Sequence, residues 1–452
     1  MAGTVCAPRR EPTGNAQAHE LRSNGDAFQG RRDGVFFSCR FVSFVDNPAS
    51  AHPAPTFHPR TMNRRHFLAL SLATGISVAA NAQEKKLRVA IIGHTGRGNY
   101  GHGLDTMWTL MPETEIATVA DADATGLAAA RKKLGGIAGF ADYRKMLAET
   151  KPDLVAVAPR YADEHRDMIL AAIESGARGI YVEKPFCRSL AEADEIVAAC
   201  AKRNVKLAIA HRNRYQPTLV TCAKLVKDGA IGRLLELRGR GKEDDRGGSL
   251  DLWVLGSHVL NMAAFFTGKP VSCTATVLQE ARPVVRDDLK DGAEGLGPLA
   301  GNEVHARFET EGGVPVFFES VAKAGMKTAG FGLQLIGTGG IIDLRCDAIP
   351  VAYILQGSPF QPTPEPRTWT PISTAGIGRP EPGENPGKLV MSHVTPGRDL
   401  IAAIREDRAP LCSAEDGRVI VEMISAVFEL HRLGGARVTF PLKTRQAPLS
   451  LF

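Results

Sequence analysis

The chain has 452 residues, of which 44% are hydrophobic and 23% charged, and its formal net charge is +6. This length suffices for two domains with sizeable cores, and the small charge without a Lys/Arg-rich block gives no reason to expect nucleic-acid binding. The eight cysteines include no Cys-x-x-Cys pair, so we expect neither a zinc site nor a redox dithiol.

The first 82 residues are expected to lie outside the fold. Residues 1–61 lack sustained hydrophobic periodicity, which predicts a disordered extension or a translation start placed too early. Residues 62–82 then carry paired arginines, a short apolar stretch and the small-residue ending Ala80-Asn81-Ala82. This pattern is typical of a twin-arginine signal peptide and predicts export to the periplasm, with no membrane span after cleavage. An uncleaved membrane anchor is the alternative.

A glycine-rich turn follows the first predicted strand, at 87–92, and precedes a helix predicted at about 101–110. Such a turn lets backbone N–H groups approach a pyrophosphate. Two registers fit, one starting at Gly96 and one at Gly93, and the second is preferred because it begins where the strand ends. A purely structural loop is the alternative. The preferred register places five residues near the phosphates: Gly93, Thr95, Gly96, Arg97 and Gly98.

An acidic residue, Asp121, ends the next predicted strand at 116–120. In a dinucleotide-binding domain, an acid at this distance from the glycine-rich turn accepts hydrogen bonds from the adenosine ribose and repels a 2′-phosphate. Asp121 therefore favours NAD over NADP. Its alternative role is to cap the helix predicted at about 124–134, although Asp123 is also placed to do this.

Strands and helices continue to alternate to about residue 210. Strands are predicted at 154–158, 179–182 and 206–210, and helices at 163–174 and from the Ser189 cap to Arg203. Repeated βα units predict an α/β fold with a doubly wound parallel sheet. We therefore expect a Rossmann domain over residues 84–213 and a second domain over 214–452.

Several motifs together resemble the glucose–fructose oxidoreductase, inositol dehydrogenase and rhizopine-catabolism (Gfo/Idh/MocA) family. They include the glycine-rich turn and Asp121, and their order and spacing are more specific than any one of them. The others are Asp142-Tyr143-Arg144, Glu183-Lys184-Pro185, Arg214-Tyr215-x-Pro217, Gly337-Thr338-Gly339-Gly340 and the closing 435–442 segment.

The resemblance implies an NAD(P)-dependent oxidoreductase that transfers hydride between the cofactor and a sugar- or polyol-like alcohol or ketone. It implies that Lys184 is catalytic, beside the nicotinamide ribose and the substrate hydroxyl, and that Glu183 orients Lys184 or the cofactor. It also implies that His258 is the base or the hydrogen-bond partner of the substrate. A lysine near the positively charged nicotinamide would have a lowered pKa and could share the substrate proton.

Two sequence departures leave the proton relay open. The family usually has Asp one helical turn before the histidine, where this chain has Val254, and Asn261 stands where Asp is also common. Asp251, two turns before His258, is a candidate substitute. The family's Thr-Pro-x-x-x-His is also altered. Pro159 and Arg160 are then expected at the cofactor, and Tyr161, Arg214 and Asn261 at the substrate.

The second half resembles the family's open, mostly antiparallel sheet, with the helix at 253–266 facing the cofactor. Extended segments are predicted at 233–240, 271–280, 303–309, 314–322 and 331–336, and a long Pro/Gly-rich loop at about 356–387. One face of such a sheet commonly mediates dimerisation, so a homodimer or homotetramer is expected. No metal is expected.

Two other functions stay open from the sequence. An NAD-dependent glycoside hydrolase or lyase would oxidise its sugar transiently and end with no net redox change. A non-catalytic dinucleotide- or sugar-binding protein is the third reading, against which Lys184 and His258 argue. Export would separate the protein from free nicotinamide nucleotides, so a tightly bound cofactor is expected.

Overall fold

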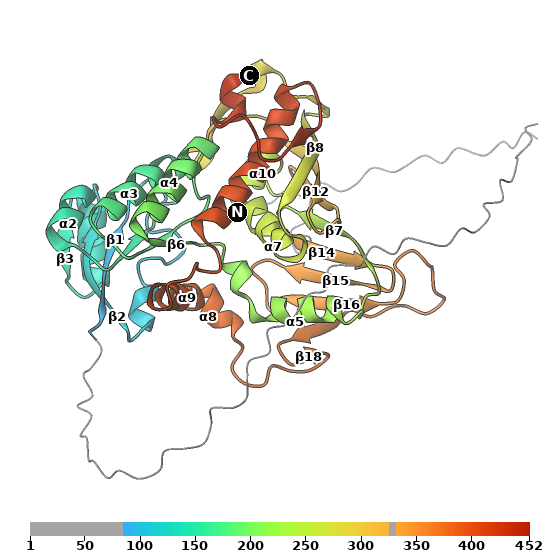
Figure 1. Cartoon of the computed structure of the whole chain (residues 1–452), viewed down its shortest axis with the longest axis horizontal. Coiled ribbons are helices and arrows are strands. Elements are labelled where there is room, and N and C mark those ends of the chain that lie inside the picture. The colour runs from blue at the N-terminus through green and yellow to red at the C-terminus, as the bar shows by residue number, and fades with distance from the viewer. Residues whose placement is uncertain (1–84, 325–330) are drawn as a thin grey trace, which may run out of the picture. The chain divides into compact units, whose positions relative to one another are not determined.

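The computed structural model describes residues 85–324 and 331–452, and the predicted extension and signal peptide lie outside these ranges. The first part is a six-stranded parallel sheet in the order β3-β2-β1-β4-β5-β6 (Figure 1). The strands are β1 (Leu87–Ile92), β2 (Thr114–Ala120), β3 (Ala138–Phe140), β4 (Leu154–Val157), β5 (Gly179–Val182) and β6 (Lys206–Ile209). The predicted doubly wound sheet is confirmed. The strand order reverses between β1 and β4, and open α/β sheets bind ligands at such a reversal.

Both faces of this sheet are covered, so every residue of β4 and β5 is buried. Ala90 and Ile92 join the core under α3 (Ala162–Glu174) and α4 (Leu190–Arg203). Val89 and Ile91 join the core on the other face, which includes residues of α9 (Val394–Arg405). The remaining helices of this part are α1 (Ala124–Lys133) and α2 (Tyr143–Thr150). The C-terminal half of the chain thus supplies one cover of the N-terminal sheet.

The helix predicted after the glycine-rich turn is absent, which corrects that prediction. Residues 93–106, called here the 93–106 loop, form turns, and only a short 3-10 helix, η1 (Met107–Leu110), follows. Gly96, Gly98 and Gly103 have φ values of 85°, 88° and 94°. Because such left-handed backbone is incompatible with an α-helix, Gly101 and Gly103, both with positive φ, prevent the predicted helix from forming at its start.

The second part is an eleven-stranded sheet in the order β18-β17-β16-β15-β14-β7-β13-β12-β8-β19, with β9 paired to β8. All pairs are antiparallel except β7 with β13, so the predicted mostly antiparallel sheet is confirmed. Its strands are β7 (Leu234–Arg240), β8 (Pro270–Gln279), β9 (Arg282–Pro283), β12 (Glu303–Thr310), β13 (Val316–Val321), β14 (Gly332–Gly337), β15 (Gly340–Arg345), β16 (Ala352–Gln356), β17 (Thr370–Ser373), β18 (Gly376–Ile377) and β19 (Val438–Thr439). The segment expected as a loop at 356–387 therefore contributes two strands, and β10 (Lys290–Gly292) pairs with β11 (Gly297–Leu299) outside the sheet.

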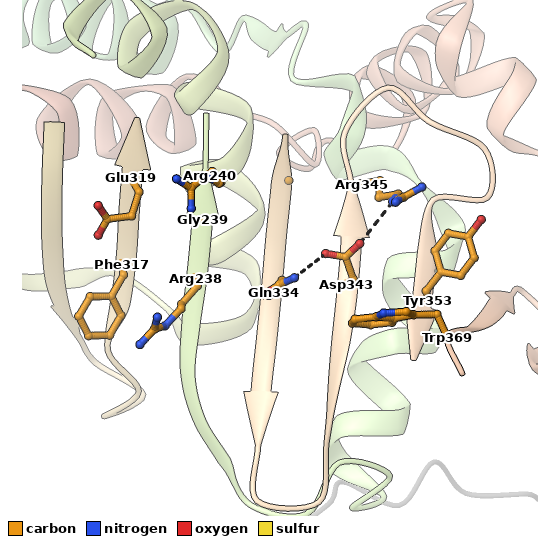
Figure 2. A pocket seen from close by; sticks show the side chains of 11 residues that line it. Arg238, Gly239, Arg240, Phe317, Glu319, Gln334, Asp343, Arg345, Tyr353 and Trp369 are labelled. Atoms are coloured by element: carbon orange, nitrogen blue, oxygen red, sulfur yellow. Dashed lines mark hydrogen bonds and ion pairs between the residues drawn. The ribbon is translucent and has the colours of Figure 1, made fainter. Parts of the chain in front are cut away.

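The exposed face of this sheet contains an open hollow of about 920 Å³ (Figure 2). Its lining alternates along the strands with residues buried on the opposite face, as the strand period of two requires. The lining combines charged and aromatic side chains: Arg238, Arg240, Phe317, Glu319, Asp343, Arg345, Tyr353 and Trp369.

Helices connect the two sheets. The long α10 (Ala414–Arg432) packs against α4, β8 and α7 (Ser257–Thr267), and Figure 1 shows it between these elements. A π-helical turn, η3 (Leu252–Gly256), joins α7 to the short α6 (Ser249–Asp251). In the described ranges, residues 249–267 form the one helical stretch long and apolar enough to cross a membrane, and 78% of it is buried inside the protein, as in a core helix. Helices α5 (Pro217–Lys227) and α8 (Gly387–Met391) complete the second part.

Candidate functional site

The 93–106 loop packs closely on the carboxyl ends of β1, β4 and β5. A Cβ at Gly98 would lie 2.3 Å from the backbone nitrogen of Arg160, and one at Gly101 would lie 2.6 Å from Cγ of Glu183. At Gly93 a Cβ would lie 2.1 Å from the ring of Tyr100. Only glycine fits these three positions, so the glycine pattern is explained first by packing of the loop against the strand ends.

Asp121 is buried and bonded to the protein. Its carboxylate accepts hydrogen bonds from Thr95 N (3.1 Å), Thr95 Oγ1 (2.7 Å), the Tyr100 hydroxyl (2.8 Å) and Asp123 N (3.0 Å). These donors use the acceptor sites on both oxygens. Asp121, which was predicted to bind the ribose, therefore anchors the 93–106 loop in this structure, because Thr95 and Tyr100 already donate hydrogen bonds to its carboxylate. The side chain of Asp123 caps α1 by accepting from Gly126 N (2.6 Å).

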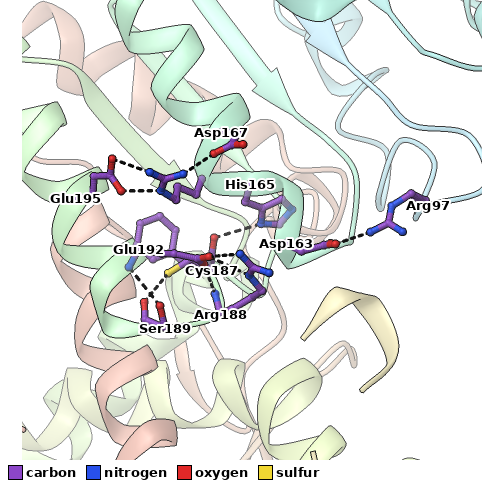
Figure 3. A network of polar contacts seen from close by, with 11 residues as sticks. Arg97, Asp163, His165, Asp167, Cys187, Arg188, Ser189, Glu192 and Glu195 are labelled. Carbon is purple, nitrogen blue, oxygen red and sulfur yellow. Dashed lines mark hydrogen bonds and ion pairs between the residues drawn. The ribbon is translucent and has the colours of Figure 1, made fainter. Parts of the chain in front are cut away.

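A pocket of about 250 Å³, called here the β2-side pocket, adjoins the ends of β1, β2 and β3. It is lined on one side by Gly93, His94 and Asp121 and on the other by Tyr143, Arg144, Asp163, Glu164 and Asp167. Two of these lining residues, Asp163 and Glu164, form ion pairs of 2.6 Å and 2.7 Å with Arg97; Figure 3 shows the first of these pairs. Arg97 thus binds carboxylates of α3.

Glu183 and Lys184 follow β5 directly. Glu183 is fully buried, and its carboxylate accepts from Lys184 N (2.7 Å) and His102 N (3.1 Å) and contacts the His102 ring at Nδ1. Burial alone would raise the pKa of this carboxyl, but the hydrogen bond and charge of His102, with Lys184 nearby, lower it to about 2. Glu183 is therefore a fixed buried anion.

The Lys184 ammonium group donates a 3.1 Å hydrogen bond to the carbonyl oxygen of Val254. Val254 lies in the π-helical turn η3, and π-helical turns are frequent at functional sites. This bond joins the end of β5 to the helix that carries His258. The backbone of residue 254 therefore contacts the lysine at the position where the family resemblance leads one to expect an aspartate side chain.

His258 is buried, and its Nδ1 has no hydrogen-bond partner among the residues that the structure describes. Its ring lies 5.4 Å from the ring of His211, edge to face. Burial, His211 and Lys184 hold the pKa of His258 well below its usual value, and burial lowers the pKa of His211 to about 3. Both imidazoles are therefore neutral at pH 7, and His258 offers an unused polar atom.

The structure brings Lys184 and His258 together in a cavity of about 40 Å³, called here the β5-side cavity. Both residues were predicted, whereas His102, Arg212, Asp347 and His393 also line the cavity and were missed. Arg212 pairs with Asp347 at 3.1 Å, and His393 accepts or donates a 2.7 Å bond with the Tyr181 hydroxyl. These four come from segments distant in the sequence. His102 lies in the glycine-rich turn and Arg212 just before the Arg214-Tyr215-x-Pro217 motif, whereas Asp347 and His393 lie in no recognised motif.

Asp251 lies apart from this cavity. Its carboxylate accepts from Ser320 Oγ (2.6 Å) and Glu243 N (3.1 Å), and it supports the turn that precedes α6. Burial raises its pKa. The prediction that Asp251 shares a helix face with His258 assumed regular α-helix, but η3 intervenes and changes the register. The structure therefore corrects that pairing.

The other predicted residues divide between the loops and the core. The carbonyl of Pro159 contacts His165 Nε2 at 2.7 Å, while His165 Nδ1 contacts the carbonyl of Pro185 at 2.8 Å, so His165 links two strand-end loops. Arg160 packs on Gly98, and Tyr161 lies under Arg97, whose guanidinium is 4.4 Å from the ring centre.

Arg214 and Asn261 do not line the β5-side cavity. The guanidinium of Arg214 stacks on Phe265, 3.9 Å from the ring centre, and Asn261 contacts Cys412 Sγ at 3.6 Å. Cys187 is buried, contacts the carbonyl of Ser189 at 3.4 Å (Figure 3), and burial raises its pKa. These three side chains thus serve packing in this structure. No cluster of three or more His, Cys, Asp or Glu residues within 85–324 and 331–452 is arranged to hold a metal ion.

Comparison with known proteins identifies the N-terminal sheet. Residues 87–211 match the model of the Gfo/Idh/MocA family, described as an oxidoreductase family with an NAD-binding Rossmann fold. This segment is therefore similar to the NAD-binding Rossmann domain of that family. The match ends after β6, so it includes the glycine-rich turn, Asp121 and Lys184 but not His258.

Curated relatives match part of the chain. D-apiose dehydrogenase of Paraburkholderia graminis is 31% identical over 160 residues, 35% of this chain and 41% of that protein. Levoglucosan dehydrogenase of Pseudarthrobacter phenanthrenivorans is 27% identical over 201 residues, 41% of this chain and 50% of that protein. The chain thus spans about half or less of the length of these relatives in the matched regions.

Solved structures share the whole fold. Levoglucosan dehydrogenase in complex with NADH and levoglucosan matches with a TM-score of 0.61 at 20% identity, over 79% of this chain and 100% of that one. An oxidoreductase from Agrobacterium radiobacter in complex with NAD+, L-tartaric acid and magnesium matches with a TM-score of 0.59 at 18% identity, over 78% and 98%. The chain therefore shares the two-part fold of these structures.

The β2-side pocket and the β5-side cavity differ in how well their described residues would accommodate NAD. The β2-side pocket offers space and polar groups beside the glycine-rich turn. Buried oxygens of Asp163 and Glu164 that line it have no hydrogen-bond partner among the described residues. The β5-side cavity has room for about one water molecule, so its lining must shift to admit a ring.

Proposed function

We propose that this protein is an NAD-dependent dehydrogenase of a sugar- or polyol-like alcohol, acting in either direction between the alcohol and the ketone. The observation that carries the proposal is the joint placement of Lys184 and His258 in one cavity at the carboxyl end of β5. This cavity adjoins a domain of the NAD-binding Rossmann type. The relatives named as D-apiose and levoglucosan dehydrogenases support a carbohydrate substrate.

Bound NAD would supply a hydride acceptor, held by the glycine-rich turn and the β2-side pocket. Lys184 would donate a hydrogen bond to the substrate oxygen, because its ammonium group already faces an acceptor, Val254 O, in the same cavity. His258 would bind a substrate hydroxyl through its unpartnered Nδ1. A buried, neutral imidazole suits this role better than uptake of a proton.

The experiment is a substrate screen with an identified cofactor. The purified protein from Gln83 onward is denatured, and released nucleotide is identified by mass spectrometry. The protein is then assayed for NADH formation with D-apiose, levoglucosan and a panel of other sugars and polyols. NAD release and NADH formation support the proposal, whereas NADP release would contradict the cofactor assignment, and no binding of either nucleotide would reject the function.

We also infer that the reaction is a net oxidation or reduction of the substrate, rather than a transient oxidation followed by glycoside cleavage. Relatives whose names state a reaction are dehydrogenases, including D-apiose, levoglucosan and scyllo-inositol dehydrogenases. Release of aglycone without net NADH would instead identify a hydrolase or lyase.

We further propose that the protein is exported by the twin-arginine route with NAD already bound. The support is the sequence of residues 62–82, with Arg64-Arg65 before a short apolar stretch. Fusion of this segment to a reporter should give periplasmic signal that Arg64→Lys with Arg65→Lys abolishes. Cytoplasmic retention of the unchanged fusion would contradict this proposal.

We also propose that a second copy covers the hollow on the large sheet. The hollow combines both charge signs with aromatic rings, and Trp369 at its edge is 40% exposed. Aromatic residues and arginine are enriched in protein interfaces. Light scattering should give at least a dimer, and Trp369→Glu should shift it toward monomer. A monomeric parent protein would reject this proposal.

A further inference from the structure

His102 makes a double contact with a buried acid. Its backbone N–H donates to Glu183 Oε1, and its ring nitrogen Nδ1 contacts the same oxygen. The His102 side chain is 41% exposed, whereas Glu183 is 1% exposed. The imidazole therefore has one edge fixed on a buried carboxylate and another edge free to meet solvent or a ligand.

The partner determines where the ring hydrogen lies. An ionised carboxylate only accepts hydrogen bonds, so the hydrogen shared with Glu183 belongs to Nδ1 of His102. In the neutral ring, Nε2 is then an acceptor with a free lone pair. In the carboxylate–histidine pairs of known catalytic sites, the carboxylate likewise fixes the histidine tautomer and stabilises the protonated ring.

Three other ionisable groups that line the β5-side cavity have lowered pKa values. His258 is buried without a carboxylate partner, and its pKa is held well below the usual value by burial. His393 bonds to Tyr181, and burial lowers its pKa to about 4. Glu183 has a pKa of about 2, because His102 and Lys184 outweigh the effect of its burial, and its oxygens already accept protein donors.

We propose that His102, oriented by Glu183, accepts the proton of the substrate hydroxyl during oxidation and returns it during reduction. This inference rests on the proposed dehydrogenase function and assigns its general base to the glycine-rich turn. Glu183 is the positioning residue, and Lys184 and His258 bind the substrate oxygens. The β5-side cavity that His102 shares with them is the size of one hydroxyl group.

Bound NAD+ would supply the acceptor for the hydride that leaves when the substrate C–H bond breaks together with its electron pair. The O–H bond breaks, its proton forms a bond to Nε2 of His102, and the electrons left on oxygen form the C=O double bond. The imidazolium is stabilised by the Glu183 carboxylate, and its exposed side lets the proton pass to water.

The first test needs no activity. Protein labelled with 15N-histidine is studied by NMR, and the His102 signal is assigned as the one lost in His102→Asn. The neutral ring is expected in the Nδ1–H form, and Glu183→Gln is expected to weaken that preference. A neutral His102 in the Nε2–H form would overturn the proposal, whether or not a substrate is known.

The second test uses turnover. His102→Gly is expected to lower kcat by about 10²- to 10³-fold with the NAD Kd changed less than about 3-fold, and added imidazole should restore part of the rate. His305→Asn, on the exposed face of β12, is the matched control and should keep the parental rate. Parental turnover in His102→Gly would overturn the proposal. If the parent forms no NADH with any substrate, the proposed function fails, and the tautomer measurement still decides the pairing.

Discussion

The β2-side pocket and the β5-side cavity share one loop but are built in opposite ways. At β2, Thr95 and Tyr100 bond to Asp121 beside a pocket of about 250 Å³. At β5, His102 bonds to Glu183 beside a cavity of about 40 Å³ with unpartnered buried imidazole nitrogens. The first end therefore resembles a preformed binding pocket, whereas the second contains buried polar atoms with no partner among the described residues. The 93–106 loop couples the two ends because it is fixed to one carboxylate at each.

The largest expected effect lies at the β5 end. Lys184→Met should lower kcat by about 10³-fold or more, because it removes the hydrogen-bond donor to the substrate oxygen, while NAD binding at the β2 end should persist. Steady-state kinetics and calorimetric titration with NAD separate the two. Lys206→Met is the control, since Lys206 pairs with Asp407 away from the crevice. If Lys184→Met lost NAD affinity as much as turnover, the β2 end could not be the part that binds NAD independently of the β5 end.

Low pH should reduce the free energy of unfolding through protonation of Glu183 at the β5 end. Its folded pKa of about 2 lies below its ordinary value of 4.5, so ionised Glu183 stabilises the fold above pH 4.5 and this stabilisation is lost as pH falls toward 2. The shift corresponds to on the order of 3 kcal/mol. The free energy of unfolding, measured by denaturant titration, should fall less steeply below pH 4.5 in Glu183→Gln than in the parent.

His211 and His393 set a second pH window. Their folded pKa values, about 3 and about 4, lie below the ordinary 6.5 because of burial, so the stability that they contribute is lost as pH falls below 6.5. The Glu183 charge raises both of these pKa values, so Glu183→Gln should lower them further and extend this window to lower pH. An equal total fall in the free energy of unfolding between pH 6.5 and pH 2 in the variant and the parent would show that Glu183 is not a buried anion.

The glycine-rich turn offers a matched pair of substitutions. Gly96 and Gly98 have nearly equal positive φ, but a Cβ at Gly96 meets nothing within 4 Å, whereas one at Gly98 meets Arg160 N at 2.3 Å. Gly96→Ala should cost about 1 kcal/mol of stability from backbone strain alone. Gly98→Ala should cost about 2 kcal/mol or more, because the loop must also move from β4. Thermal unfolding checks this, and equal costs would mean that the loop is not packed as described.

The smallest expected effect is at the β2 end. Tyr100→Phe removes one of several donors to Asp121 and should cost about 1 kcal/mol of stability. NAD affinity should stay within a few-fold, because Thr95 still bonds to the carboxylate. Tyr353→Phe removes a hydroxyl group from the hollow on the large sheet, away from Asp121, and is the control for NAD affinity. Loss of NAD binding in Tyr100→Phe would show that the β2-side pocket needs all of the hydrogen bonds to Asp121 in order to bind NAD.

The sequence predicted the regular elements well where local pattern and tertiary packing agree. The strand at 179–182 and the Ser189 cap are confirmed, because apolar β-strands between helices and a serine cap are local signals. The helix predicted at 101–110 does not form, because glycines with left-handed backbone conformation interrupt the segment whose apolar spacing suggested a helix. The predicted pair of Asp251 with His258 failed because a π-helical turn cannot be recognised from residue spacing. Arg212, Asp347 and His393 were missed because only the tertiary fold brings them to Lys184.

The most direct test of the account is to follow hydrogen from substrate to cofactor. The protein is incubated with NAD+ and a sugar found active in the screen, deuterated at the carbinol carbon, and the nucleotide is analysed by mass spectrometry. If hydride transfer takes place at the β5 end, the parent protein should yield singly deuterated NADH and Lys184→Met should yield none. Consumption of the sugar with no deuterium in the nucleotide would contradict hydride transfer at the β5 end and with it the proposed function.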